Sequence, residues 1–306
     1  MSPRLARGKP SAEAFQVSDA AQVPMVEPPE PDAATESEEP AAPEELAVPA
    51  AMMEPTEPAL GPDPAGHATV SFHVSRFKTA DRKSQFDDFE LEVALGATVL
   101  DALLQIRRRH DPSLVVRHSC MHASCGTCGV RVNGREVLGC DTKLANLPAG
   151  KPIKIEPLAN QRSVADLATD MVDFYARFEA AGMPLTRAVE ANDDASPPEN
   201  IRAFTRFENC IECGLCLSAC PVARTNRSYI GPAALAAAER VVEEPRGNDL
   251  GPVLALAAEP DSVWRCHDAL ECTAVCPSAV EPARAVLGIR RQIAVDRVKR
   301  LFGGGL

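Results

Sequence analysis

Alternating apolar and polar positions predict that ordered structure begins near residue 67. In Thr69–Phe77 (TVSFHVSRF), apolar side chains take every second position from Val70 to Val74, and Phe89–Val93 (FELEV) follows the same period. Residues at a period of two share one face of a strand. We therefore expect two strands that pair across Thr79–Asp87.

The pattern then changes to a helix and returns to strands. Thr98 and Asp101 form a capping signature at the start of TVLDALLQIRRRH, residues 98–110. Asn133-Gly134 is a strong signal for a two-residue hairpin turn. Ile153–Glu156 (IKIE) is expected to be a closing strand, which gives a ββα unit followed by a hairpin and a last strand.

The second half of the chain has helical periodicity. Ser163–Gly182 is expected to be one amphipathic helix ended by Gly182 and Pro184. The polar segment Ala191–Asn200 is expected to be a loop, and GPAALAAAERVVEE, residues 231–244, a helix.

A last helix is expected in PARAVLGIRRQIAVDRVKRLF, residues 282–302. It has an apolar stripe and ends at Gly303–Gly305. The stripe consists of Val286, Ile289, Ile293 and Val298.

Composition sets residues 1–66 apart from the remaining chain. This segment holds 13 of the 27 prolines and carries a net charge of −10, nearly all of the −11 of the whole chain. Its one aromatic residue is Phe15. Such a segment buries too little apolar surface to offset the entropy lost on ordering. We expect a disordered acidic tail rich in proline and alanine, with a docking arm as the alternative.

The remaining residues are nearly neutral, so the charge does not favour a nucleic-acid partner. No signal peptide and no run of about 18 apolar residues is apparent. The eleven cysteines are an odd number, and most are separated by only two to four residues, which favours thiols that bind metal over a disulfide framework. GxGxxG and Walker A loops are absent from the sequence, and it shows no group suited to acid-base or nucleophilic catalysis.

The first cysteine group has plant-type ferredoxin spacing. Cys120, Cys125 and Cys128 follow C-x4-C-x2-C, the pattern of a 2Fe-2S cluster. A hairpin at Asn133-Gly134 brings Cys140 next to Cys128, which completes four thiolates. Structural zinc at these cysteines is the alternative. His118 and His122 lack the Cys-x-His spacing of a Rieske site and are interpreted as loop residues.

The second cysteine group, CIECGLCLSACP, has the bacterial ferredoxin spacing C-x2-C-x2-C-x3-C-P. WRCHDALECTAVCPSAVEP repeats its steps, with Ala269 where the second cysteine would stand. Two-cluster ferredoxins exchange their last cysteines, so we expect Cys276 to join the first three cysteines of the run around a 4Fe-4S cluster. That run consists of Cys210, Cys213, Cys216 and Cys220.

The third group is expected to hold a 3Fe-4S cluster. Cys220, Cys266 and Cys272 offer only three thiolates, and a cubane that lacks one protein ligand tends to lose that iron. Water or another side chain could instead complete a fourth iron. Two zinc knuckles are a weaker alternative, because a zinc site needs neither the matched spacing nor the two Cys-Pro endings.

These motifs together resemble the iron-sulfur subunit of succinate dehydrogenase and fumarate reductase over residues 67–300. The resemblance rests on SCxxxxCGxCG, DLATDMVDFY, CIECGLCLSACP, YIGPAAL and CHDALECTAVCP. It implies an α+β chain with three parts. These are the tail (1–66), a plant-type β-grasp ferredoxin domain (67–162), and an all-α, bacterial-ferredoxin-like helical domain with two clusters (163–306).

The resemblance also implies the partners. Electrons would pass between FAD on a flavoprotein subunit and quinone at a membrane anchor, with the chain held peripherally at the cytoplasmic face of the cell membrane. His267 matches a histidine of the quinone pocket, although hydrogen bonding to the cluster is an equal alternative. Pro221 and Trp264 lie near that end in sequence, and Trp264 is otherwise a packing residue.

Two features of the resemblance leave alternatives open. VARTNRSYIG follows Pro221 where many ubiquinone-reducing relatives carry tryptophans, so the quinone type and a haem in the anchor stay open. The same module also serves thiol-driven fumarate reductases and other flavin dehydrogenases. The cysteine-rich CCG domain common in the thiol-driven relatives does not occur in this sequence.

Overall fold

The computed structural model describes residues 66–78, 83–94, 96–183, 206–243 and 250–301. The acidic tail, the loop predicted at 191–200 and the glycine stop at 303–305 lie outside these residues, apart from Gly66. The described chain combines a mixed sheet with a helical part, as the predicted α+β class requires.

The first two strands form an antiparallel ribbon. β1 (His67–Lys78) pairs with β2 (Lys83–Ala94) along its whole length, which confirms the predicted pairing. The predicted connection across 79–87 was too long, because residues 83–88 belong to β2. Residues 83–88 are mostly polar but still pair with β1. A cross-strand contact supports this pairing, because the ring of Phe86 stacks on His73 of β1 with 4.3 Å between the ring centroids.

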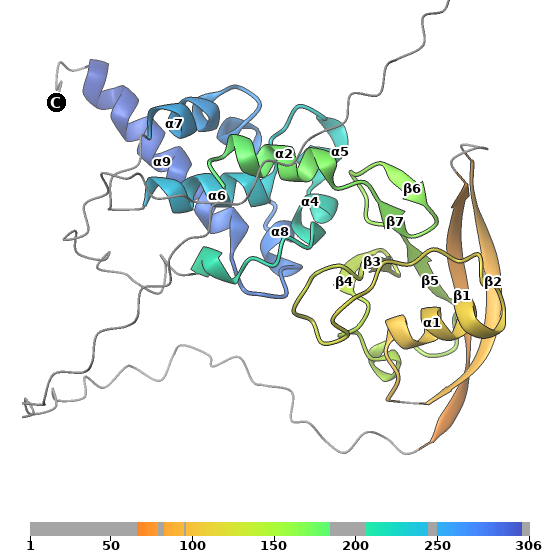
Figure 1. Ribbon diagram of the computed structural model, residues 1–306. Helices are drawn as coiled ribbons and strands as arrows, with labels where there is room; N and C mark the ends of the chain where they lie inside the picture. Colours follow the sequence, from red (N-terminus) through yellow and green to blue (C-terminus); the bar gives the residue numbers. More distant parts are fainter. Residues whose placement is uncertain (1–65, 79–82, 95, 184–205, 244–249, 302–306) are drawn as a thin grey trace, which may run out of the picture. The chain divides into compact units, whose positions relative to one another are not determined.

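Three shorter strands complete the sheet in the order β2-β1-β5-β3-β4 (Figure 1). β3 (Gly129–Val132) and β4 (Arg135–Leu138) form the predicted hairpin, whose turn residues Asn133 and Gly134 have φ of 50° and 86°. β5 (Ile153–Glu156) is the predicted closing strand and runs parallel to β1. A short 3-10 turn, η1 (Leu144–Asn146), precedes it.

α1 (Val99–Arg109) begins at the predicted capping box. The Thr98 hydroxyl accepts a hydrogen bond from the Asp101 N–H, and the Asp101 carboxylate accepts one from the Thr98 N–H. These bonds satisfy two N–H groups at the helix start. The apolar face of α1 and the inner face of the sheet belong to one core, whose least exposed side chains include Phe72, Val74, Leu100, Leu103, Ile106 and Ile155.

The helix predicted over 163–182 is wrong in its first half. Residues 163–169 form a small hairpin of β6 (Ser163–Ala165) and β7 (Ala168–Thr169), and only Val172–Ala180 is helical, as α2. The buried carboxylate of Asp166 accepts hydrogen bonds from the N–H groups of Phe77 and Val115. These long-range bonds stabilise a turn with φ of 42° at Asp166, which overrides the local helical periodicity.

Helices dominate the chain beyond residue 205. They are η2 (Arg206–Asn209), α4 (Leu215–Ala219), α5 (Pro221–Thr225), α6 (Pro232–Val242), α7 (Gly251–Ala258), η3 (Val263–Arg265), α8 (Glu271–Ala274) and α9 (Pro282–Leu301).

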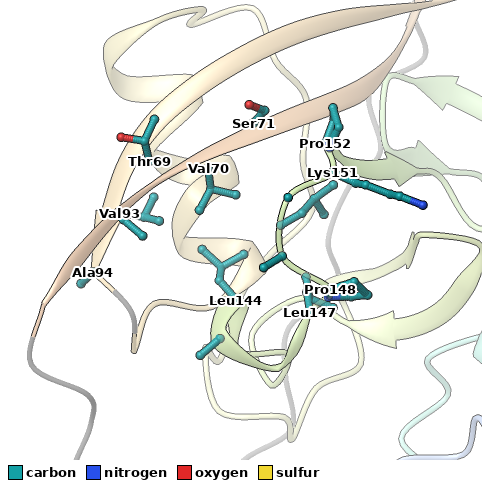
Figure 2. A pocket seen from close by; sticks show the side chains of 15 residues that line it. Thr69, Val70, Ser71, Val93, Ala94, Leu144, Leu147, Pro148, Lys151 and Pro152 are labelled. Atoms are coloured by element: carbon teal, nitrogen blue, oxygen red, sulfur yellow. The ribbon is translucent and has the colours of Figure 1, made fainter.

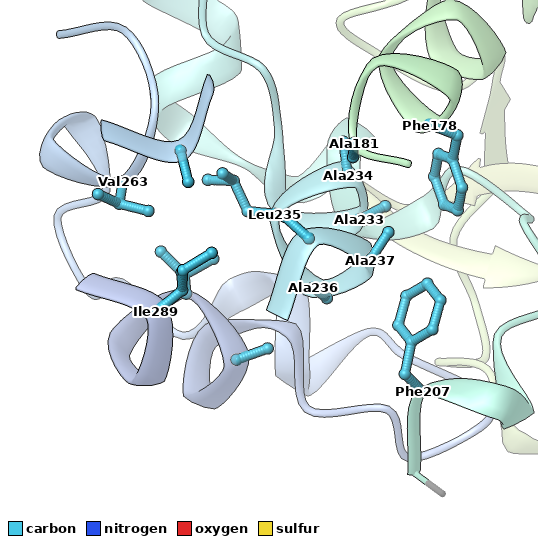
Figure 3. Packing of buried hydrophobic residues seen from close by; sticks show 14 of the residues in the cluster. Phe178, Ala181, Phe207, Ala233, Ala234, Leu235, Ala236, Ala237, Val263 and Ile289 are labelled. Atoms are coloured by element: carbon cyan, nitrogen blue, oxygen red, sulfur yellow. The ribbon is translucent and has the colours of Figure 1, made fainter. Parts of the chain in front are cut away.

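α6 is the central helix of the second core and confirms the helix predicted at 231–244. Nearly all of its side chains are buried, including five alanines, and it contacts α2, α4, α7 and α9. Alanine allows neighbouring helices to approach from every side. Figure 3 shows buried side chains on both sides of α6, with Phe178 and Phe207 on one side and Leu235 directed toward Val263 and Ile289 on the other.

α9 confirms the predicted last helix but not its whole stripe. Val286, Ile289 and Ile293 are buried, whereas Val298 is 52% exposed. Val298 stands five positions after Ile293, and five steps along an α-helix turn it by about 140° from the starting face. Val298 therefore points away from the core.

A cavity of about 470 Å³ lies beside β1 in the first core (Figure 2). β5 pairs with β1 only at Phe72–Val74, so Ala68–Ser71 face the segment 144–152 across the cavity. Its walls are mainly apolar, with Val70, Val93 and Leu147 among them. Its lining residues include none of the cysteines, so this cavity is separate from the predicted clusters.

A partly buried carboxyl on α6, that of Glu239, lies directly against α9. A Cβ added to Gly288 would lie 2.2 Å from the Glu239 Oε1 atom. Burial raises the pKa of Glu239 to about 8, and nearby Glu243 adds to the rise while Arg284 opposes it. The folded protein therefore holds this proton at neutral pH, whereas the unfolded chain releases it above its ordinary pKa of about 4.3.

We expect Glu239→Gln to stabilise the protein increasingly as the pH rises. The wild-type folded state loses stability between the unfolded pKa and the folded pKa of about 8, because only the unfolded chain ionises there. Thermal unfolding from pH 5.5 to 8.5 should show a gap in Tm between variant and wild type that widens toward pH 8. The exposed Glu259→Gln is the control and should give a constant gap. A pH-independent gap for Glu239→Gln would contradict the protonation of this carboxyl.

Candidate metal centres

The first cysteine group lies in a tightly wound loop. Met121, Ala123 and Gly126 all have positive φ, which bends the backbone around the sulfur atoms. The hairpin extends past β3 and β4 through a hydrogen bond from the Gly139 N–H to the Cys128 carbonyl. The Cys128 and Cys140 Sγ atoms are consequently 3.3 Å apart, which confirms that the hairpin returns Cys140 to the loop.

Backbone N–H groups point at these sulfurs. The Ala123 N–H donates to Cys140 Sγ at 3.2 Å, and the Cys140 N–H donates to Cys128 Sγ at 3.5 Å. Burial raises the pKa of Cys128 to about 12, whereas the His122 N–H and other donors lower the pKa of Cys120 to about 7. Buried thiols with N–H donors around them suit thiolates whose charge is balanced by a bound cation.

The two histidines of this region, His118 and His122, lie in the backbone of the cysteine loop and its approach. The His122 ring nitrogen Nδ1 lies within hydrogen-bond distance of the Cys120 carbonyl, so its contact is with the loop backbone. His118 stands two residues before Cys120 and is exposed. Both fit the interpretation as loop residues.

The second cysteine group lines one cavity in the helical part. This cavity is apolar, with Phe174 and Phe207 in its wall. Burial raises the pKa of Cys210 to about 12 and of Cys213 to about 11. The cysteines that line it are the four that the ferredoxin frame groups together, Cys210, Cys213, Cys216 and Cys276.

The third group lines a neighbouring cavity. Cys220, Cys266 and Cys272 face it together with Ala269, the residue that replaces a cysteine in the matched frame. Tyr229 also lines it and is 1% exposed, so burial raises the pKa of its hydroxyl well above the ordinary value. Periodicity alone missed Tyr229, although it stands in the YIGPAAL motif.

The two cysteine runs repeat in backbone as well as in spacing. Glu212 and Asp268, each two residues after the first cysteine of its run, have φ of 53° and 56°. Two residues further, Gly214 and Leu270 have φ of 77° and 60°. α4 and α8 then begin at matching positions. The frame inferred from sequence is therefore a structural repeat.

The first and second loops touch without an intervening side chain. A Cβ added to Gly126 would lie 2.7 Å from the Cys213 Cβ and 2.8 Å from the Ile211 carbonyl oxygen. Real Cβ atoms do not approach so closely, so only glycine fits there. The two cysteine loops are in van der Waals contact at this point.

Two of the three residues predicted near a quinone line the same cavity. His267 and Pro221 line the third cavity. Trp264 is 37% exposed and is absent from the described lining of that cavity. Its indole N–H donates to the Ala258 carbonyl at 3.1 Å, and the Arg297 guanidinium lies over its ring. These contacts fit the packing role.

The donor chemistry fits iron-sulfur clusters, whose usual protein ligands are cysteine thiolates. Eleven cysteines form three groups, and two of the groups line cavities. In the part of the chain that the structure describes, no three His, Cys, Asp or Glu side chains converge on one point as ligands of a single ion. Thiols spread around an apolar cavity match the larger footprint of an iron-sulfur cluster.

Two family models match the same regions. Residues 71–176 match a 2Fe-2S iron-sulfur cluster binding domain, and residues 206–280 match a 4Fe-4S dicluster domain. Fold and site thus define a two-domain iron-sulfur protein with a 2Fe-2S domain followed by a helical 4Fe-4S domain.

Relatives that match over both domains identify the family within this class of iron-sulfur proteins. The fumarate reductase iron-sulfur subunit of Mycobacterium tuberculosis (strain CDC 1551 / Oshkosh) is 32% identical over 77% of this chain and 98% of its own length. The succinate dehydrogenase iron-sulfur subunit of Coxiella burnetii (strain RSA 493 / Nine Mile phase I) is 33% identical over 73% and 97%. The chain belongs to the family of succinate dehydrogenase and fumarate reductase iron-sulfur subunits.

A solved structure supports the same assignment. A chain of the Mycobacterium smegmatis Sdh1 complex in the apo form superposes with a TM-score of 0.66 at 25% identity. The match covers 76% of this chain and 98% of that one. The fold of the family therefore extends over both cysteine-bearing parts.

We expect Gly126→Ala to weaken the contact between the first two loops. Its φ of 69° disfavours alanine by about 1 kcal/mol, and the added Cβ must also displace Cys213. The measurement is Tm and iron content of the anaerobically purified protein, both of which should fall.

Gly134→Ala is the matched control. Its φ is 86°, but an added Cβ meets nothing within 4 Å, so only the backbone penalty applies. Equal losses in the two variants would show that the contact at Gly126 does not matter.

Proposed function

We propose that this chain relays electrons between FAD on a flavoprotein partner and quinone at a membrane anchor. The observation that carries the proposal is the series of three cysteine groups, in which the first two loops touch and the second and third line neighbouring cavities. Bound clusters would supply one-electron transfer, and the dicarboxylate chemistry would belong to the partner.

Each group would hold one cluster. The first group suits a 2Fe-2S cluster because Cys128 and Cys140 are close enough to share one iron. The second group, with four thiols around one cavity, suits a 4Fe-4S cluster. The proposed ligands are Cys120, Cys125, Cys128 and Cys140 for the first cluster, Cys210, Cys213, Cys216 and Cys276 for the second, and Cys220, Cys266 and Cys272 for the third.

Ala269 supports a 3Fe-4S cluster at the third site. It lines the cavity at the position where the matched run carries Cys213, and its methyl group cannot bind iron. The left-handed backbone on both sides of it, at Asp268 and Leu270, matches that around Cys213. The loop therefore has the shape of a four-ligand site and lacks one ligand.

The protein would adjust each cluster through hydrogen bonds and burial. N–H groups lie near Cys140 Sγ and, at 3.4 Å, near Cys276 Sγ from Val280. Such donors stabilise the more negative, reduced state and raise its potential. His267 and Pro221 line the third cavity, so they are our candidates for contact with quinone, with Trp264 on a more peripheral surface.

The partner chains would supply the membrane attachment. No helix among the described residues is long and apolar enough to cross a bilayer. By likeness to the subunits named above, the chain would sit peripherally on the cytoplasmic face, between the flavoprotein and the anchor. The quinone type and a haem in the anchor belong to that partner.

We expect Ala269→Cys to change the third cluster to the 4Fe-4S type. A thiolate there would complete four ligands, so the EPR signal of an oxidised 3Fe-4S centre should disappear and iron content should rise by about one atom per chain. Ala269→Val is the control, because its side chain has no atom that can bind iron, and it should keep the 3Fe-4S signal. Wild-type protein that already lacks that signal, or that contains zinc without iron, would refute the assignment.

We also expect the native complex to contain a flavoprotein and a membrane subunit. Affinity purification of the full chain from detergent-solubilised membranes, followed by flavin analysis and quinone reduction with succinate, tests this. Recovery without either partner, or turnover driven by a thiol donor in place of quinone, would favour the thiol-linked alternative.

A further inference from the structure

The short helix α4 lies among proposed ligands of two clusters, and it packs against the core of the first domain. Its five residues include Cys216, with Cys213 two residues before the helix and Cys220 directly after it. Leu215 is 1% exposed and belongs to the core around the sheet, although it lies in the helical part of the sequence. The placement of α4 therefore determines how the cysteine groups are spaced.

One side of α4 is held by a buried hydroxyl. Ser218 is fully buried, and its Oγ donates to the Glu136 carboxylate at 2.9 Å and accepts from the Ala159 N–H at 2.8 Å. Glu136 is 7% exposed, and the Arg131 Nε atom lies 3.3 Å from it. A buried carboxylate needs such partners, so this contact fixes α4 against β4.

Asn160 holds the end of α4. Its Nδ2 group lies 2.8 Å from the Leu217 carbonyl, 2.9 Å from the Ser218 carbonyl and 3.1 Å from the Cys220 carbonyl. The last carbonyls of a helix lack partners within the helix, so a residue from the segment after β5 supplies them here. Asn160 has φ of 61°, a conformation that asparagine tolerates better than most residues.

The other end of the same short segment meets the first cysteine loop. Cys213 lies against Gly126, and α4 is only about 7.5 Å long at 1.5 Å per residue. A tilt of α4 at its Asn160 end would therefore move Cys213 relative to Gly126, because only Gly214 lies between Cys213 and the helix.

We propose that Asn160 is a positioning residue that sets the spacing between the first and second clusters by capping α4. It is not proposed to touch either cluster; it acts through the carbonyls at the end of α4 and through Cys220. The inference rests on the proposed function, because it presumes clusters at the first two cysteine groups.

The test compares Asn160→Gly and Asn160→Asp in the native complex, purified anaerobically and fully reduced. Glycine keeps the positive φ and removes the amide, whereas aspartate keeps the shape and turns a carboxylate toward three carbonyls. The readout is the magnetic coupling between the two reduced centres, seen as broadening and faster relaxation of the 2Fe-2S EPR signal. This coupling falls with the cube of the distance.

We expect Asn160→Gly to weaken the coupling and Asn160→Asp to weaken it further, with both centres still present. Ile293→Val in α9 is the control for stability alone, since it removes one buried methylene from the second core, away from Leu215 and from both cysteine-lined cavities, and should lower Tm without changing the coupling. Should Asn160→Asp not fold, Asn160→Gly decides the question.

The outcomes separate this inference from the proposed function. Unchanged coupling in Asn160→Gly, with Tm lowered as in the control, would make Asn160 merely structural and overturn the inference. Absence of both iron-sulfur signals from the wild type would instead overturn the proposed function.

Discussion

The structure depends on a close approach between two backbone segments, at Gly126 and Cys213. One belongs to a loop of the sheet domain and the other to a run in the helical part, and no side chain fits between them. The approach requires a glycine in a left-handed conformation, a hairpin that returns Cys140 to its loop, and a short helix pressed into a core formed mainly by another domain. The glycine, the hairpin and α4 together bring the two cysteine loops into contact.

Two kinds of interaction hold α4, which follows Cys213 on the helical side of this contact. Apolar packing places α4, because Leu215 is buried with the side chains of the sheet and α1. Hydrogen bonds from Asn160 and Ser218 then determine its orientation, since packing alone is not directional. The polar groups involved are buried or nearly so, which makes an incorrect orientation costly because carbonyls and a carboxylate would lose their partners.

Local patterns predicted the features whose causes are local. The Asn133-Gly134 turn and the Thr98 capping box each involve residues close in sequence, and the structure reproduces them. Long-range partners defeated the local pattern at Asp166, which bonds to Phe77 and Val115 and so interrupts a predicted helix. Asn160 and Ser218 gave no signal for the same reason, since their partners lie up to 82 residues away along the chain.

The alanine-rich α6 places a limit on how this protein can vary. Ala233 lines the second cavity and Pro232 the third, while the rest of the helix is buried among its neighbours. The wall of the two proposed cluster cavities and the centre of the hydrophobic core are therefore formed by one helix. A larger side chain at Ala233 would press on the second cavity and on the hydrophobic core together, so a substitution there would change both the stability of the fold and the electrochemistry of the proposed cluster.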